Sequence, residues 1–251
     1  MVTMSFFAVG KIIAERWKIQ YLADRGGMGM VFKALDLETQ REVALKVLPI
    51  GMLSERASAR FLRECQTLSA LSHPNIVSYV AHGEVTPGQP YLAMEWLEGE
   101  SLAHRLARQP LTIEETLTLL HPVAQALSAA HARGIVHRDL KPSNIFLRDG
   151  KLDAATLIDF GIAHGVLGRA AYRLTNPGAL LGSPDYLSPE QARGLQDISP
   201  SADIFSLGCV VYQCLAGHTP FAGGHTAALL TKILFEEPTS LQQFVAIPDH
   251  L

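Results

Sequence analysis

The chain has 251 residues, of which 48% are hydrophobic, and its formal net charge at pH 7 is −3. This length and composition predict one large domain or two small lobes with cores of their own, and the charge balance provides no basic field that would attract a nucleic acid. No run of about eighteen apolar residues is present that could cross a membrane. Cys65, Cys209 and Cys214 lack the CxxC spacing of a zinc site, so we expect buried, reduced thiols in a cytoplasmic protein.

The chain up to about residue 95 has the pattern of a β-rich lobe. Residues 1–15 are apolar without a charged leader, and we expect them to form an N-terminal extension. Phe61, Cys65 and Leu68 recur at helical spacing and predict a helix over residues 54–71. Alternating or apolar runs predict strands over residues 16–22, 31–35, 42–48, 76–82 and 91–96, with turns at 36–41 and 86–88.

The character of the sequence changes after Gly99, where helical patterns become dominant. Amphipathic or apolar helices are predicted over residues 111–132, 202–215 and 226–235, the first of them ended by Gly134. Short strands are expected around residues 137–144, followed by a loop rich in Gly and Pro over residues 161–189. A mostly β lobe therefore precedes a mostly α lobe, with a junction near residues 95–100, and clefts between lobes are preferred ligand sites.

Two motifs of the first lobe suggest phosphate binding without proving it. Residues 24–29 read DRGGMG, and glycines of this kind can present backbone N–H groups to phosphate oxygens, although an ordinary Gly-rich hairpin tip is the commoner meaning of this segment alone. The motif does not open a helix, and no GxxxxGK[ST] occurs, which disfavours dinucleotide-binding and P-loop folds. Ala44 and Lys46 in VALK share one face of a strand and suit a flat base followed by its phosphates, unless Lys46 is an ordinary edge lysine.

The remaining motifs bring together acids, bases and amides. Residues 137–144 read HRDLKPSN, and Asp159-Phe160-Gly161 follows the apolar run 155–158. Asp159 and Asn144 carry the hard oxygen ligands that Mg²⁺ prefers. Glu64, in the predicted helix, could supply the carboxylate that a half-buried Lys46 needs, although a solvated acid is the simpler reading of Glu64 alone. Each short motif could occur by chance, but chance does not explain VALK, Glu64, HRDLKPSN and DFG occurring in this order.

With these motifs in this order, the sequence resembles the eukaryotic-like (Hanks-type) serine/threonine protein kinases, in particular the bacterial branch, from residue 16 to the end. The segments GSPDYLSPE (182–190) and DIFSLG (203–208) extend the resemblance. It implies a bilobal protein kinase fold of the α+β class, with an N-lobe over residues 16–95, a hinge at 95–100 and a C-lobe over 101–251. It also implies that ATP, with Mg²⁺ or Mn²⁺, lies in the cleft and that its γ-phosphate passes to Ser or Thr hydroxyls of proteins.

The resemblance also assigns roles to individual residues. Asp139 would accept the proton of the substrate hydroxyl, Lys141 would neutralise the γ-phosphate, and Asn144 and Asp159 would hold the metal. Lys46 would contact the α- and β-phosphates and be held by Glu64. His137 is expected to pack locally near Phe160, Asp203 to brace the catalytic loop, and Glu100 to contact ribose or simply to be solvated. The nucleotide would be bound by Gly26, Gly27, Gly29, Val31, Ala44, Lys46, Met94, Glu95 and Leu97.

Regulation by phosphate is a further implication of the resemblance. Arg138 would pair with a phosphate on the activation segment, for which Tyr172, Thr175 and Ser183 are the hydroxyl-bearing candidates. Thr175 is the favoured autophosphorylation site, and Ser183 is expected to contact Asp139 and Lys141. Because relatives dimerise through the first lobe, a homodimer is an additional expectation.

The sequence departs from the family pattern at two places. Asp24 replaces the first loop glycine, which predicts weakened ATP affinity at most. The sequence ends at Leu251, where the family continues with helices whose arginine pairs with the equivalent of Glu190, so the last helices of the C-lobe are expected to be missing. A pseudokinase scaffold that binds nucleotide without turnover therefore stays an alternative, whereas a small-molecule kinase of the aminoglycoside type is disfavoured by LKPSN together with GSPDYLSPE.

Overall fold

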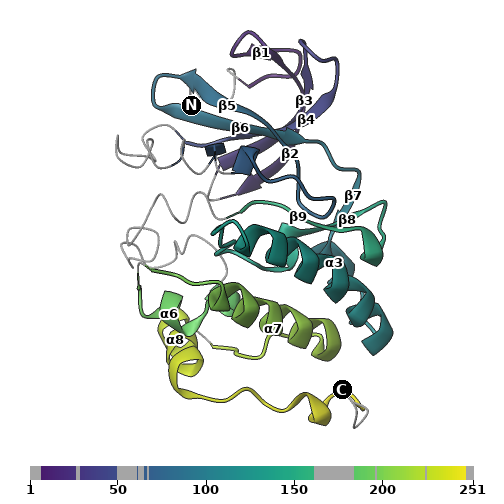
Figure 1. Ribbon diagram of the computed structural model, residues 1–251, viewed down its shortest axis with the longest axis vertical. Coiled ribbons are helices and arrows are strands. Elements are labelled where there is room, and N and C mark those ends of the chain that lie inside the picture. The colour runs from purple at the N-terminus through teal and green to yellow at the C-terminus, as the bar shows by residue number, and fades with distance from the viewer. Residues whose placement is uncertain are drawn as a thin grey trace. The chain divides into compact units, whose positions relative to one another are not determined.

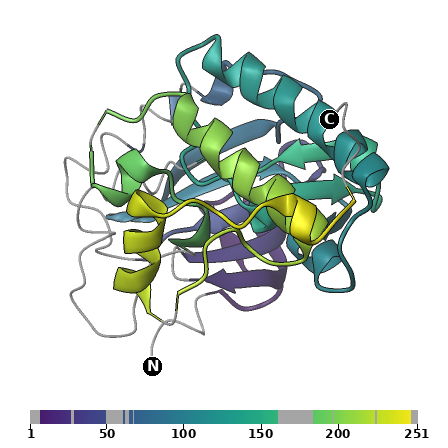
Figure 2. The ribbon, with the colours of Figure 1, turned by 90° about the horizontal axis from the view of Figure 1, so that it is seen from below.

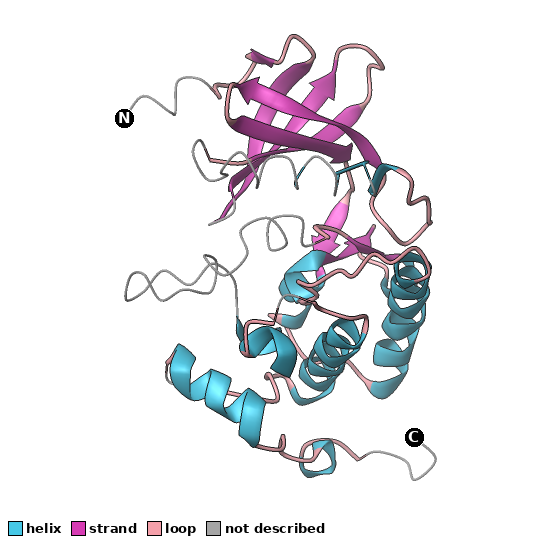
Figure 3. Cartoon of the chain, turned by 60° about the vertical axis from the view of Figure 1, so that its left-hand side comes forward, coloured by secondary structure: helices cyan, strands magenta, loops and turns pink. Residues whose placement is uncertain are grey.

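The computed structural model describes residues 7–26, 29–49, 61, 65–66, 68–160, 184–195, 197–223 and 225–246. The chain forms two compact units. The first comprises Met1–Ser72, Val77–Leu97 and Gly165–Leu167, and the second comprises His73–Ile76, Glu98–His164 and Gly168–Leu251. Figure 3 shows that described strands dominate the first unit and described helices the second.

An antiparallel sheet forms the first unit, and its strand order is β1-β2-β3-β4-β6-β5 (Figure 1). The predicted hairpins are present, because the turns near residues 36–41 and 86–88 join neighbouring strands of this sheet. The strands are β1 (Ile12–Ile13), β2 (Trp17–Gly26), β3 (Gly29–Asp36), β4 (Glu42–Val47), β5 (Tyr79–Thr86) and β6 (Gln89–Glu95).

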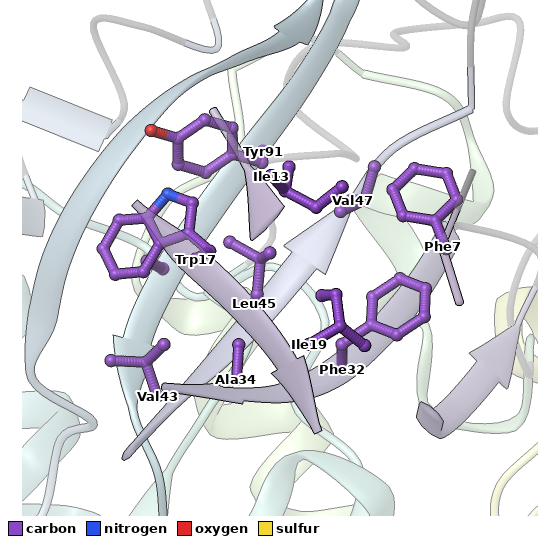
Figure 4. Close-up of a cluster of buried hydrophobic side chains, with 11 residues drawn as sticks. Phe7, Ile13, Trp17, Ile19, Phe32, Ala34, Val43, Leu45, Val47 and Tyr91 are labelled. Carbon is purple, nitrogen blue, oxygen red and sulfur yellow. The ribbon is translucent and has the colours of Figure 1, made fainter. Parts of the chain in front are cut away.

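The core of the first unit lies on one face of this sheet. Along β4, Val43, Leu45 and Val47 are buried and alternate with less buried residues, as expected for a strand with one apolar face. Figure 4 shows the side chains that meet on this face. The cluster consists of Phe7, Ile13, Trp17, Ile19, Phe32, Ala34, Val43, Leu45, Val47, Tyr91 and Ala93.

The described residues before Arg16 are part of the sheet and its core, whereas the sequence suggested an extension. Ile13 lies in β1, which pairs with β2, and it is only 2% exposed. Phe7 stacks on Phe32 with ring centroids 5.2 Å apart. A strand of two residues has no period that sequence analysis can detect, so only the folded sheet reveals that these apolar side chains complete the core.

A buried carboxylate fixes the turn between β3 and β4. Asp36 is fully buried and accepts hydrogen bonds from Arg16 Nε and Nη2, both at 2.8 Å, and from the Glu38 N–H. The Arg16 guanidinium holds the pKa of Asp36 well below its ordinary value and also lies over the Trp17 ring at 4.4 Å. This network ties the start of β2 to the turn that follows β3.

The second unit combines the small antiparallel sheet β7-β8-β9 with helices. Its longest helix, α3, begins with a capping box formed by Thr112 and Glu115, and it packs side by side with α7 (Figure 2). The predicted helices over 111–132, 202–215 and 226–235 correspond to α3, α7 and α8, whereas β7, α2 and α6 were not predicted. The elements are β7 (Gly99–Ser101), α2 (Leu102–Leu106), α3 (Ile113–His131), η1 (Pro142–Asn144), β8 (Ile145–Arg148), η2 (Leu152–Ala154), β9 (Ala155–Leu157), η3 (Pro184–Tyr186), α6 (Pro189–Ala192), α7 (Ser201–Ala216), α8 (Thr226–Phe235) and η4 (Leu241–Gln243).

The three cysteines lie in the interior of the protein. Cys65, Cys209 and Cys214 are buried. Burial raises the pKa of the Cys209 thiol and of the Cys214 thiol to about 12. These thiols are therefore protonated and unreactive near neutral pH. Among the described residues, no helix combines the length and the apolar character that a membrane crossing requires.

Candidate active site

One buried carboxylate organises the HRDLKPSN segment. Asp203, in the first turn of α7, is fully buried. Its Oδ2 accepts from the His137 N–H at 2.7 Å and from His131 Nε2 at 2.8 Å, and its Oδ1 accepts from the Arg138 N–H at 2.8 Å. Arg138 has a φ of 65°, which an L-residue rarely adopts, so these bonds to Asp203 stabilise an otherwise unfavourable turn.

The other side of this turn is held from α6. Gln191 Nε2 donates to the Arg138 carbonyl oxygen at 2.7 Å. Gln191 is itself fixed, because it forms a capping box with Ser188 at the start of α6. The peptide units on both sides of Arg138 are thus anchored by residues far away in the sequence.

The His137 imidazole is neutral, and its hydrogen bonds define its tautomer. Its Nδ1 accepts from the Asp139 N–H at 3.4 Å, and its Nε2 therefore carries the proton that is donated to the Ile158 carbonyl at 3.1 Å. Complete burial lowers the pKa of His137, which agrees with the neutral form. The ring also contacts the Phe160 ring, at a centroid distance of 4.6 Å. His137 thus links the backbone of the HRDLKPSN segment to the end of β9.

The carboxylate of Asp139 is the convergence point of the site. Lys141 Nζ donates to Asp139 Oδ1 at 3.1 Å and to Oδ2 at 2.9 Å. Asn144 Nδ2 donates to Asp139 Oδ2 at 3.0 Å and to the Asp139 carbonyl oxygen at 2.8 Å. The Asp139 side chain is 15% exposed. The segment thus presents an oriented, ionised acid next to a fixed cation, which is an arrangement that can accept a proton.

Asn144 and Asp159 lie at the ends of two paired strands. Ile145 of β8 pairs with Leu157 of β9, and the Ile158 N–H donates to the Asn144 carbonyl oxygen at 3.0 Å. The amide nitrogen of Asn144 is engaged by Asp139, so its side-chain oxygen is the atom left for another ligand. Together with the Asp159 carboxylate, this donor set consists of hard oxygens and fits a divalent cation such as Mg²⁺.

In the first unit, the sheet face opposite the core carries four of the residues predicted to bind a nucleotide. Directly paired residues of neighbouring strands point to the same face. Val31 pairs with Lys46, and Ala44 pairs with Met94, whereas the neighbouring residues of β4 point into the core. Val31, Ala44, Lys46 and Met94 therefore share one face, where an apolar strip adjoins a lysine.

The hairpin between β2 and β3 contains the predicted glycine motif. Gly29 has a φ of +132°, and a Cβ atom placed there would lie 2.3 Å from the Val47 carbonyl oxygen. Only glycine fits this position, because β3 approaches the end of β4 so closely. Gly26 pairs with Gly29 and has open space around it. The motif thus allows the close backbone approach that a phosphate would need.

Comparison with known sequences places the chain in a family. Residues 22–248 match the family model of the protein kinase domain. The chain belongs to the protein kinase family. The serine/threonine-protein kinase pkn3 of Myxococcus xanthus is 40% identical over 235 residues, which cover 92% of this chain and 43% of that protein. PknB of Mycobacterium tuberculosis is 36% identical over 231 residues, 90% of this chain and 36% of that protein. The kinase chain thus spans about two fifths of the length of these relatives.

Solved structures agree with the kinase fold. The PknI kinase domain of Mycobacterium tuberculosis superposes with a TM-score of 0.72 at 27% identity, covering 94% of this chain and 83% of that one. Rad53 in complex with AMP-PNP gives a TM-score of 0.70 at 27% identity, covering 87% and 53%. The predicted fold class and family membership are confirmed. Protein kinases in general use ATP with a divalent cation.

Several predicted kinase residues lie outside the described part of the chain. They are Gly27, Glu64, Tyr172, Thr175 and Ser183. Arg138, whose expected partner is a phosphate on the activation segment, has a buried Nε with no hydrogen-bond partner among the described residues.

Two carboxylates near the hinge, that of Glu100, whose role the sequence left open, and that of Glu95, have partners within the chain. Glu100 forms a bidentate ion pair with Arg108, with distances of 2.6 and 2.7 Å, which lowers the pKa of Glu100. The Glu95 side chain accepts from the Ser78 N–H at 2.8 Å. Both carboxylates are therefore already occupied by groups of the chain itself.

His131 and Gln191 are site residues that sequence analysis missed. His131 is the last residue of a long amphipathic helix, and nothing in the local pattern marks it as a partner of Asp203. Gln191 had a usable signal, because the sequence SPEQ has the spacing of a capping box and places an amide next to the segment that bonds to Arg138.

Proposed function

We propose that this kinase transfers the γ-phosphate of ATP to Ser or Thr hydroxyls of proteins and autophosphorylates its activation segment. The observation that carries the proposal is the Asp139 carboxylate, oriented by Lys141 and Asn144 on a backbone turn that Asp203 fixes. A pseudokinase would not need all of these groups in one constellation.

The chemical roles follow from the charges of these groups. Asp139 would accept the proton of the attacking hydroxyl as its oxygen bonds to the γ-phosphorus, while the bond from that phosphorus to the β–γ bridging oxygen breaks and ADP leaves. Lys141, held at the same carboxylate, stabilises negative charge on the transferred phosphoryl group. Because Lys141 is already in place, little reorganisation is required when that charge develops.

The acceptor is proposed to be a Ser or Thr side chain in a protein. The LKPSN sequence after Asp139 is the form found in serine/threonine-specific kinases, and the curated relatives pkn3 and PknB are named as kinases of this class. GSPDYLSPE, which shapes a peptide-binding surface in the family, supports a protein acceptor over a small molecule.

The cation is proposed to be Mg²⁺, or Mn²⁺ in its place, held by Asn144 and Asp159. When bound, it would neutralise phosphate oxygens and hold them in line for transfer. Asn144 Nδ2 remains bonded to Asp139, so the same side chain would join the metal site to the general base.

The nucleotide is proposed to bind the face formed by Val31, Ala44, Lys46 and Met94. The two apolar residues Val31 and Ala44 would contact adenine, and Lys46 would contact the phosphates with Glu64 as its partner. The backbone of residues 95–97 would bond the edge of the base. Asp24, at the base of the glycine hairpin, would weaken ATP binding without abolishing it.

Autophosphorylation with labelled Mg-ATP tests the proposal. We expect incorporation by the wild type, with Thr175 as a mapped site, and at least about a hundredfold less by Asp139→Asn, because the general base is lost. Asp197→Asn, at an exposed position of the same unit, is the matched control and should retain activity.

The outcomes separate the candidate functions. Label in the wild type and in Asp197→Asn but not in Asp139→Asn supports a Ser/Thr kinase. Equal label in Asp139→Asn would refute the assigned base. No label in any protein, although ATP raises the melting temperature, would instead indicate a nucleotide-binding scaffold.

A further inference from the structure

An aromatic and cationic cluster lies at the end of β6 in the first unit. Lys33 Nζ lies over the Trp96 ring, 4.9 Å from its centroid, and the Tyr21 ring meets Trp96 edge-on at 6.0 Å. Lys33 also pairs with Glu42 at 2.8 Å, and its side chain is only 12% exposed. A lysine so nearly removed from water interacts more strongly with an aromatic face than an exposed one does.

The register of the sheet places this cluster next to the proposed adenine site. Tyr21 pairs with Lys33, Lys33 with Ala44, and Ala44 with Met94. These residues form one row across the sheet, on the face opposite the core. Tyr21 and Lys33 therefore continue the same face that carries Ala44 and Met94.

The segment after β6 is held from two sides. On one side, Glu95 donates its N–H to the Ser78 carbonyl oxygen at 2.9 Å and accepts from the Ser78 N–H at 2.8 Å. On the other side, Trp96 is held by Lys33 and Tyr21. Leu97 is buried, with 9% exposure. Residues 95–97 are thus held by the Ser78 backbone at Glu95 and by the Lys33 and Tyr21 side chains at Trp96.

We propose that Tyr21, Lys33 and Trp96, which we call the Trp96 clamp, are positioning residues for nucleotide recognition. The clamp keeps the backbone of residues 95–97 in the conformation that bonds the adenine edge, and so it sets the affinity for ATP. This inference rests on the proposed function, since it assumes that the face beside the clamp binds a nucleotide.

The clamp should act on binding and not on phosphoryl transfer. If the clamp loosens, the fraction of molecules with a competent segment falls, and the apparent dissociation constant rises by the inverse of that fraction. The adenine contacts are the same in the ground state and in the transition state, so their loss raises KM and leaves kcat unchanged.

The decisive substitution is Lys33→Met, which removes the cation and keeps an unbranched stem. We expect the KM for ATP to rise about three- to tenfold with kcat unchanged. A change of this size in affinity corresponds to the free energy of a partly desolvated cation–π contact. Lys33→Arg keeps a cation over the ring and should restore most of the affinity. Lys18→Met, on the exposed side of β2, makes the same charge change without a contact to Trp96 and should behave as wild type.

A binding measurement separates the clamp from catalysis. The dissociation constant of AMP-PNP with Mg²⁺ is measured by calorimetry in an Asp139→Asn background, with and without Lys33→Met and Lys18→Met. Trp96 emission gives a second readout, because Trp17 is the other tryptophan of the chain and is fully buried. Only Lys33→Met should weaken binding, and the melting temperatures without nucleotide should stay close to one another.

Each outcome decides the inference. Equal AMP-PNP affinities of the Lys33→Met and Lys18→Met proteins would overturn it. So would a fall in kcat and melting temperature without a change in affinity, since Lys33 would then be only a structural residue. The proteins could bind AMP-PNP with the expected difference while the protein that retains Asp139 never transfers phosphate. That result would support the role of the Trp96 clamp and refute the proposed activity. No binding by any protein would overturn both.

Discussion

Replacing Asp203 by Asn should separate the folding role of this buried carboxylate from the chemistry of Asp139. The carboxylate accepts hydrogen bonds from the His137 N–H, the Arg138 N–H and His131 Nε2. An amide has one accepting oxygen, so at least one of these donors would face an NH₂ group. Losing one hydrogen bond to a charged acceptor and leaving a buried donor unpaired costs about 3–5 kcal/mol of unfolding free energy.

Urea unfolding followed by circular dichroism measures this cost. Asp197→Asn, which makes the same chemical change at an exposed position, should change the unfolding free energy by less than about 0.5 kcal/mol. Autophosphorylation should fall strongly in Asp203→Asn even at temperatures where the protein is folded, because the turn at Arg138 is no longer held. A cost below about 1 kcal/mol, or full activity, would refute the view that Asp203 braces the site.

Three further predictions concern single positions. Gly29→Ala should lower the unfolding free energy by at least about 2 kcal/mol, because the new Cβ would collide with the Val47 carbonyl. Gly26 has open space around it, so Gly26→Ala should lower the unfolding free energy by less than about 1 kcal/mol. Chemical denaturation measures both values. The pKa of His137 is lowered in the folded state, so at acidic pH the unfolded chain binds a proton on this imidazole more readily than the folded chain does. The free energy of unfolding should therefore fall as the pH drops below about 6.5. A His137→Tyr protein, which lacks the imidazole, should show a shallower fall. His225→Ala should cost about 1 kcal/mol, because the imidazole Nδ1 caps α8 by accepting from the Ala228 N–H.

Opposite results would contradict the physical reasons given. Equal stability of the two glycine variants would mean that the hairpin relaxes around a new side chain. An unchanged pH slope in His137→Tyr would place the titrating group elsewhere in the chain. A His225→Ala protein as stable as wild type would show that the cap contributes nothing measurable.

Strongly periodic segments were predictable, and short ones were not. The helix predicted over residues 226–235 coincides with α8, and the predicted hairpin over residues 31–48 is formed by β3 and β4. These segments carry enough apolar residues to define a period and a buried face. β1, β7, α2 and α6 have five residues or fewer, so their apolar residues define no period. β1 and β7 form because β2 and β8 supply their hydrogen-bond partners, whereas α2 and α6 begin at the side-chain caps Ser101 and Ser188.

The role of Glu100 could not be predicted from the sequence alone. From the sequence, Glu100 could equally be a ribose contact or a solvated acid. In the structure, α2 follows at once and returns the chain so that Arg108 engages both carboxylate oxygens. The choice depended on the direction in which the helix leaves the strand, and that direction is a property of the packed unit.

The sequence by itself determined the chemistry that this protein can carry. The motifs VALK, HRDLKPSN and DFG specify the residue types, and their order and spacing along the chain indicate a protein kinase. Only the tertiary structure decided how these groups are held, because their supports are distant in sequence: Asp203 lies 66 residues from His137, and Gln191 lies 53 residues from Arg138. The Trp96 clamp is of the same kind, since the cation and the ring meet only when β3 and β6 are joined through β4. Hydrogen bonds and ring contacts act over a few ångströms, so folding alone determines which distant residues come within that range.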